Sequence, residues 1–154
     1  MAKESSQLNV LKRIEVSKEH DAALDLQSAN SFLMASQSKL EEVQRYKIEY
    51  LIKLQEKGMS GVMGDSYAHY QRFIVQLDQG IAAQSQVVET AKQVVEQRKN
   101  DWLAQKNKVT AVQTLLTKQQ NARQIKEDKF EQNQQDEFAS QLYFRNQIRQ
   151  KHQS

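Results

Sequence analysis

Apolar residues recur along this chain at alternating intervals of four and three residues, in two long runs. The first run has ten positions: Ala22, Leu26, Ala29, Leu33, Ser36, Leu40, Val43, Lys47, Tyr50 and Leu54. The second run has fifteen positions, twelve of them apolar: Tyr67, Tyr70, Ile74, Leu77, Ile81, Gln84, Val88, Ala91, Val95, Arg98, Trp102, Gln105, Val109, Val112 and Leu116. A mean step of 3.5 residues is typical of helices that wrap around each other with a left-handed twist. The pattern therefore predicts two long helices that share one apolar seam.

A glycine-rich segment separates the two runs. Three of the four glycines fall within 58–64, and an Asp-Ser pair follows the last of them. Glycine is favoured just after a helix end, and Asp or Ser just before a helix start. We therefore expect a helix over about 4–57, a turn over 58–65 and a helix over about 66–150, all within a single coiled-coil domain spanning 1–154.

The second helix is expected to extend well past the first. If the chain folds back near residue 61, residue n lies opposite roughly residue 123 minus n, so the start of the first helix faces about Leu116. Beyond Leu116 only two of the next nine seam positions are apolar. The unpaired length is about 35 residues, or about 50 Å at 1.5 Å per residue. The prediction is an all-α fold: a long antiparallel two-helix coiled coil, or helical hairpin, whose second helix overhangs the first.

The predicted overhang carries apolar side chains although no intrachain partner faces it. These are Phe130, Phe138, Leu142, Tyr143, Phe144 and Ile148. From Ala139 onward the chain has Arg145, Arg149 and Lys151 but no carboxylate. Because a helix of this length is only marginally stable without a packing partner, we expect the segment to become fully ordered on one. The alternatives are a frayed tail, or a surface for crystal or dimer contacts.

A second candidate surface lies near the turn, and we call it the aromatic stripe. Its members are Val43, Tyr46, Tyr50, Phe73 and Leu77. Folding back near residue 61 sets Tyr50 opposite Phe73 and Tyr46 opposite Leu77. Two helices cannot cover both flanks of a seam, so part of the stripe should stay exposed, as at a binding site. The alternative is that these aromatics only cap the end of the coiled coil.

Composition and charge argue against most other functions. The chain has no cysteine, and its three histidines lie far apart without a metal-ligand spacing. It has no glycine-rich phosphate-binding motif, no apolar run near the ~18 residues of a membrane span, and no apolar signal core at its N-terminus. The net charge is +3, and Lys and Glu interleave along both runs, so nucleic acid finds no basic block beyond the thin C-terminal set. We therefore expect no enzymatic activity, no cofactor, no metal, no small-molecule substrate and no nucleic acid.

Several motifs follow one another in a recognisable order. They are Tyr46-x-x-x-Tyr50, the Gly- and Met-rich turn, Tyr70-Gln71-x-Phe73-Ile74-x-x-Leu77, Trp102, and Asp136-Glu137-Phe138-Ala139. In their joint order and spacing, these motifs resemble the flagellar export protein FliJ family from end to end.

The resemblance implies a cytoplasmic component of the flagellar type III export apparatus, peripheral to the inner membrane at the flagellar base, with a role in flagellum biogenesis, motility and chemotaxis. Proteins of this family form an antiparallel coiled coil similar to the central stalk of rotary ATPases. They sit in the export ATPase ring, promote its assembly, link it to the membrane export gate and handle empty export chaperones. On this basis the aromatic stripe is expected to bind the cytoplasmic domain of the gate. The residues expected to bind the ATPase ring are Leu8, Leu11, Phe138, Leu142 and Arg145.

Three other functions stay open at this point. The equivalent stalk of an injectisome secretion system would have the same physical pattern. A generic coiled-coil scaffold that dimerises through its overhang is a rival from a different class, and a nucleic-acid binder is a distant third.

Overall fold

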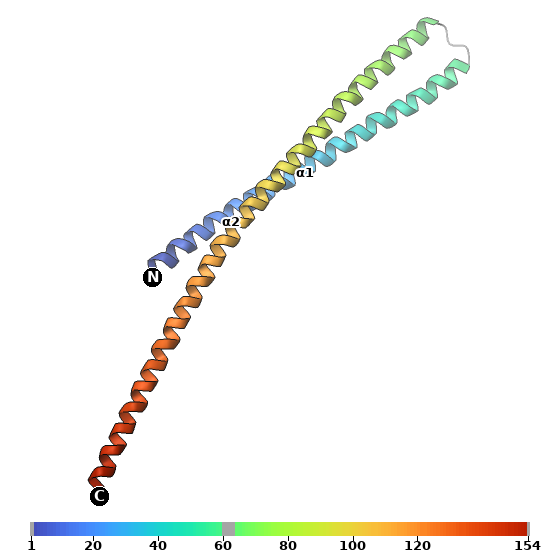
Figure 1. Cartoon of the computed structure of the whole chain (residues 1–154). Coiled ribbons are helices and arrows are strands. Elements are labelled where there is room, and N and C mark those ends of the chain that lie inside the picture. Colours follow the sequence, from blue (N-terminus) through green and yellow to red (C-terminus); the bar gives the residue numbers. More distant parts are fainter. Residues whose placement is uncertain (1, 60–63, 154) are drawn as a thin grey trace. The chain divides into compact units, whose positions relative to one another are not determined.

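The computed structural model describes residues 2–59 and 64–153, and each of these segments is one α-helix (Figure 1). Helix α1 covers Ala2–Met59 and helix α2 covers Gly64–Gln153. Residues 60–63, which belong to the predicted turn, lie outside the described residues. The described part of the chain contains no strand, so the predicted all-α class is confirmed.

Both helices owe their length to a lack of helix-breaking residues. The chain has no proline, the residue that interrupts a helix most strongly. Gly80 lies within α2, where glycine costs about 1 kcal/mol relative to alanine. A Cβ atom at Gly80 would meet open space, so no neighbouring segment described here requires a glycine at that position.

The chain divides into two compact units, and both helices contribute to each. The hairpin unit is Val16–Asn107. The terminal unit combines the described residues of Met1–Glu15 and Lys108–Ser154. The single domain expected over 1–154 stays a prediction.

In the hairpin unit, α1 and α2 pack in opposite directions. The Gln84 side-chain amide donates a hydrogen bond of 3.0 Å to the Ser36 carbonyl oxygen. Nearer the turn, Lys47 forms an ion pair with Asp78. In each pair, the midpoint of the two residue numbers falls in the segment between the helices, as expected for a chain that folds back near residue 61. The predicted antiparallel hairpin is confirmed.

The predicted seam is the covered face of the hairpin unit. All ten seam positions of α1 are buried or half-buried, and the most covered residues of the unit are Ala91, Ser36 and Val88, at 3%, 5% and 6% exposure. Two predicted seam positions of α2 are wrong, because Tyr67 is 49% exposed and Arg98 is exposed as well. Tyr67 lies within the first turn of α2, at the end of the paired region. The long Arg98 side chain reaches to solvent, where its guanidinium lies 3.9 Å from the Asp101 carboxylate.

In the terminal unit, the start of α1 packs against α2. Ser5 Oγ donates a hydrogen bond of 3.3 Å to Gln119 Oε1, and Arg123 Nη2 donates one of 3.0 Å to Ser5 Oγ. Val112 and Leu116 are the buried apolar residues in the described part of this unit, at 7% and 6% exposure.

Beyond this contact α2 continues alone. Every described side chain over 124–153 is exposed, and this range is the overhang of the structure. In Figure 1 it is the orange-to-red part of α2, which has no second helix beside it. The predicted overhang is therefore confirmed, and it begins just past Arg123, whose side chain hydrogen-bonds to Ser5 of α1.

Candidate functional site

Four aromatic side chains form a cluster across the two helices near the turn. The Tyr50 and Phe73 rings have centroids 4.7 Å apart, and Tyr46 meets Phe73 edge-on at 6.3 Å. Tyr46 also stacks on Tyr50 at 6.5 Å, and Tyr70 lies 5.9 Å from Tyr50. Such ring pairs are worth about 0.5–1.5 kcal/mol each beyond the area that they bury. The cluster therefore fastens α1 to α2 as well as offering an aromatic surface.

Exposure separates the members of the aromatic stripe. Tyr46 is 50% exposed, whereas Val43, Tyr50, Phe73 and Leu77 are half-buried. Among the members of the aromatic stripe, Tyr46 therefore has the largest exposed fraction available to a partner. The half-buried members shape the surface around it and hold the helices together.

Sequence reasoning missed Lys57 as a member of this region and did not include Tyr70 in the aromatic stripe. The Lys57 ammonium donates a hydrogen bond of 3.0 Å to the Tyr70 hydroxyl oxygen, and this bond raises the pKa of Lys57. Burial raises the pKa of Tyr50, and Tyr70 and Tyr46 add to the shift. Two features of the sequence could have indicated this bond: the seam position of Tyr70 and the presence of a lysine thirteen residues before it.

The residues expected to bind the ATPase lie in two separate places of the terminal unit. Leu8 is half-buried and Leu11 is 40% exposed, and both line a groove of about 420 Å³ together with Leu115. Three further residues lie on the overhang: Phe138 at 64% exposure, Leu142 at 42%, and Arg145, which is also exposed. From Leu115 to Phe138 the distance along α2 is about 35 Å at 1.5 Å per residue. The structure does not bring the two groups together.

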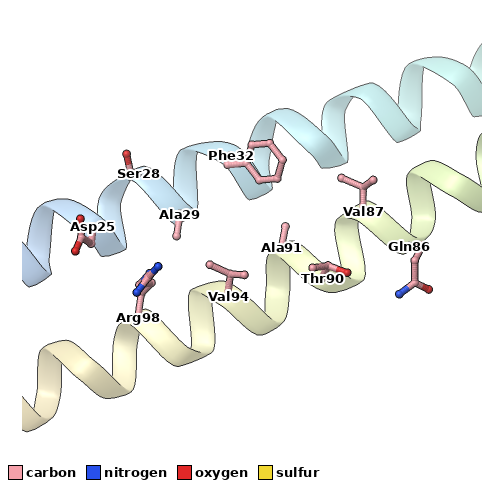
Figure 2. A pocket seen from close by; sticks show the side chains of 10 residues that line it. All are labelled: Asp25, Ser28, Ala29, Phe32, Gln86, Val87, Thr90, Ala91, Val94 and Arg98. Atoms are coloured by element: carbon pink, nitrogen blue, oxygen red, sulfur yellow. The ribbon is translucent and has the colours of Figure 1, made fainter.

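A groove on the side of the hairpin unit was not predicted. It has a volume of about 620 Å³ and runs between the two helices (Figure 2). Asp25 and Arg98 line it, and Phe32 and Val87 border it at 59% and 39% exposure. Phe32 and Val87 each lie one position before a seam residue, so the seam pattern gave no reason to single them out.

We searched the described residues for two further features, a metal site and a membrane-spanning helix. No group of three or more His, Asp or Glu side chains there is arranged to hold a metal ion. Neither described helix contains a stretch that is long and apolar enough to cross a membrane. What the described surfaces offer is contact area, in the form of an aromatic stripe and an exposed overhang.

Comparisons with known proteins identify the family of this chain. The family model described as flagellar FliJ protein matches residues 4–148. The flagellar FliJ protein of Escherichia coli (strain K12) is 28% identical over 142 residues, which cover 92% of this chain and 97% of that protein. The flagellar FliJ protein of Salmonella typhi is 26% identical over 138 residues, which cover 90% of this chain and 94% of that protein.

No solved structure matches the chain with significance. The family match, in contrast, covers almost all of α1 and α2, including the aromatic stripe and most of the overhang. The resemblance found from the sequence motifs is confirmed, and the chain belongs to the flagellar FliJ protein family.

Proposed function

We propose that this chain is a non-catalytic coiled-coil stalk of the flagellar protein export apparatus. In this role it promotes assembly of the export ATPase ring, links the ring to the cytoplasmic domain of the membrane export gate, and handles export chaperones. It acts in the cytoplasm, at the inner face of the membrane beneath the flagellum. Membership of the FliJ family supports a place in flagellar export rather than in an injectisome.

The observation that carries the proposal is the overhang. Its described side chains are all exposed, and they include Phe130, Phe138 and Phe144 at 63–64% exposure. Exposed aromatic side chains on an unpaired helix are unfavourable in water and favourable in an interface. A ring of ATPase subunits is a partner that can surround a single helix and cover all its faces.

The aromatic stripe supports a second partner in a different unit of the chain. The half-exposed Tyr46 ring is held in place by contacts with Tyr50 and Phe73. A rigid aromatic side chain loses little conformational entropy when it binds, which is why such residues dominate many interfaces. We assign this stripe to the export gate.

Two measurements, one of binding and one of ATP turnover, test the proposal together. The first is capture of the gate's cytoplasmic domain by the purified chain, and the second is stimulation of ATP turnover by the purified export ATPase. A stalk engages both partners. A chain that neither captures the gate domain nor raises ATP turnover is a generic scaffold instead, and the proposal is wrong.

A further inference from the structure

One face of the overhang carries charges in an order that the proposed function does not explain. Six exposed side chains occupy this face, which we call the charged stripe: Glu127, Glu131, Phe138, Leu142, Arg145 and Arg149. At about 100° per residue, they fall within an arc of about 60° around the helix axis. Along the stripe two carboxylates come first, two apolar side chains follow, and two guanidinium groups come last.

The charges at each end of the stripe repel one another within the chain. Glu127 and Glu131 are four residues apart, and so are Arg145 and Arg149. Like charges at this spacing are neighbours on the helix surface and destabilise it. An oppositely charged partner on this face would remove both repulsions.

The stripe is complementary to itself when a second copy runs in the opposite direction. If Phe138 is placed next to Phe138 of a second copy, Glu127 lies opposite Arg149 of that copy, and Glu131 lies opposite its Arg145. Each ion pair then occurs twice, because both copies use the same patch. The Phe138 and Leu142 side chains fill the centre, and ion pairs flank it on both sides.

We propose that the overhang is a homodimerisation surface on which two copies of this chain pair antiparallel through the charged stripe. The paired region is 127–149, about 33 Å at 1.5 Å per residue. This is a short coiled coil, and ion pairs on an exposed surface are weak. The dimer is therefore reversible and forms at high concentration of the free chain.

Pairing has a consequence for the ATPase contact, and this part rests on the proposed function. The dimer covers Phe138, Leu142 and Arg145, the residues assigned to the ATPase on the overhang. The dimer and the ATPase-bound chain are therefore alternative states. A second copy of the chain and the ATPase ring would therefore compete for Phe138, Leu142 and Arg145.

The first test is sedimentation equilibrium of the full-length chain alone, from about 10 to 500 μM, a range suited to weak complexes. The average mass should rise from 17.9 kDa towards twice that value as concentration increases. The rise should be smaller in about 0.5 M salt than in 0.05 M salt, because salt screens exposed charges. A mass that stays at 17.9 kDa throughout overturns the proposal.

Charge reversal tests the pairing itself. The double variants Glu127→Arg/Glu131→Arg and Arg145→Glu/Arg149→Glu should each weaken self-association about 10-fold or more, because like charges then face each other. An equimolar mixture of the two variants should associate again, as should the chain that carries all four changes. Self-association that survives either double variant at wild-type strength, such as pairing through another face, overturns the proposal.

A control reverses two charges on the opposite face of the helix and leaves the net charge of the chain unchanged. Lys129→Glu/Asp136→Arg lies about 150–170° from the centre of the charged stripe at 100° per residue. This variant should associate like the wild type. For the apolar centre, Phe138→Ala should weaken association, whereas Tyr143→Ala should not, although both rings are 63–64% exposed.

Cysteine cross-linking tests the direction of pairing, which is simple because the chain has no native cysteine. Glu127→Cys and Arg149→Cys chains should form a disulfide with each other when mixed and oxidised. Neither should cross-link with itself. Self-cross-linking of each variant, without mixed product, means parallel pairing and overturns the antiparallel arrangement.

These tests use the chain alone, so they are independent of the proposed function. If self-association is absent, the assignment of the overhang to the ATPase still stands. If the dimer forms but ATP turnover is not stimulated, the dimer stands and the stalk function fails.

Discussion

Tyr50 on α1 packs against two rings of α2, with Phe73 at 4.7 Å and Tyr70 at 5.9 Å between ring centroids. This packing does two things at once. It fastens the two helices together near the turn, and it partly removes the Tyr50 hydroxyl from water. Burial therefore raises the pKa of Tyr50, with smaller contributions from Tyr70 and Tyr46.

The first prediction is that alkaline pH destabilises the hairpin unit through Tyr50. In an unfolded chain tyrosine ionises with a pKa of about 10, and in the folded chain the pKa of Tyr50 is higher. The stabilisation is fully present below the unfolded pKa and is lost as the pH rises through the folded pKa. Between pH 9 and pH 11, Tyr50→Phe should therefore lose less in Tm than the wild type, as followed by circular dichroism.

Lys57 acts in the same direction, because its hydrogen bond to Tyr70 raises the pKa of Lys57 and its contribution is also lost at high pH. The matched control is Tyr67→Phe, which changes a tyrosine that is 49% exposed. This control should lose as much in Tm as the wild type. If Tyr50→Phe loses as much Tm between pH 9 and pH 11 as the wild type, ionisation of Tyr50 does not cause the loss of stability at alkaline pH.

The second prediction concerns the gate-binding surface. Tyr46→Ala should weaken capture of the gate's cytoplasmic domain by about 2 kcal/mol, as for a central aromatic anchor. Its effect on helicity and on ATPase stimulation should be small, since Tyr46 is 50% exposed. Isothermal titration calorimetry measures the affinity directly.

Two variants control for general effects on this surface. Tyr67→Ala removes an equally exposed tyrosine outside the aromatic stripe and should leave gate binding unchanged. Phe73→Ala should weaken binding but also lower the unfolding midpoint, because its ring packs on Tyr50. A Tyr46→Ala chain that binds the gate domain as tightly as the wild type contradicts the assignment.

The third prediction concerns the overhang. Truncation of the chain before Asp136 removes Phe138, Leu142 and Arg145 and should abolish stimulation of ATP turnover. Gate binding should be retained, because the aromatic stripe belongs to the hairpin unit. Coupled ATP-turnover assays and gate pull-downs on the same preparation read the two activities separately. Loss of both activities in a chain that remains helical would refute the separation of the two surfaces.

The fourth prediction concerns Trp102, which occupies a seam position of α2. Its ring is half-buried, and the Lys106 ammonium lies 5.1 Å from the ring centroid. Trp102→Ala should lower the free energy of unfolding by about 2–4 kcal/mol, at or below the range for fully buried aromatics. Urea denaturation followed by circular dichroism checks this, with Leu103→Ala as an off-seam control that should cost about 1 kcal/mol or less. An unchanged midpoint for Trp102→Ala means that its ring does not pack in the seam.

The fold could be predicted from the spacing of apolar residues together with the glycine-rich turn, because a mean step of 3.5 residues identifies the covered face of a helix. Ser36 and Lys47 illustrate the strength of this rule, since both are polar and both lie on the covered side of α1. The surfaces could be predicted less well. The seam pattern does not say which flanking residues remain open, so the groove beside Phe32 and the bond between Lys57 and Tyr70 were not foreseen. Both depend on side-chain rotamers rather than on periodicity.

No described side chain of this chain is completely shielded from solvent. The fold therefore lacks the kind of interior that constrains amino-acid identity in globular proteins, and substitutions can accumulate at most positions. Insertions and deletions are a different matter, because one extra residue within a helix rotates everything after it by about 100° and takes it off the seam. In the evolution of such a chain, amino-acid substitutions should be frequent and changes of helix length rare. This expectation agrees with relatives that keep 26–28% identity over at least 90% of the chain.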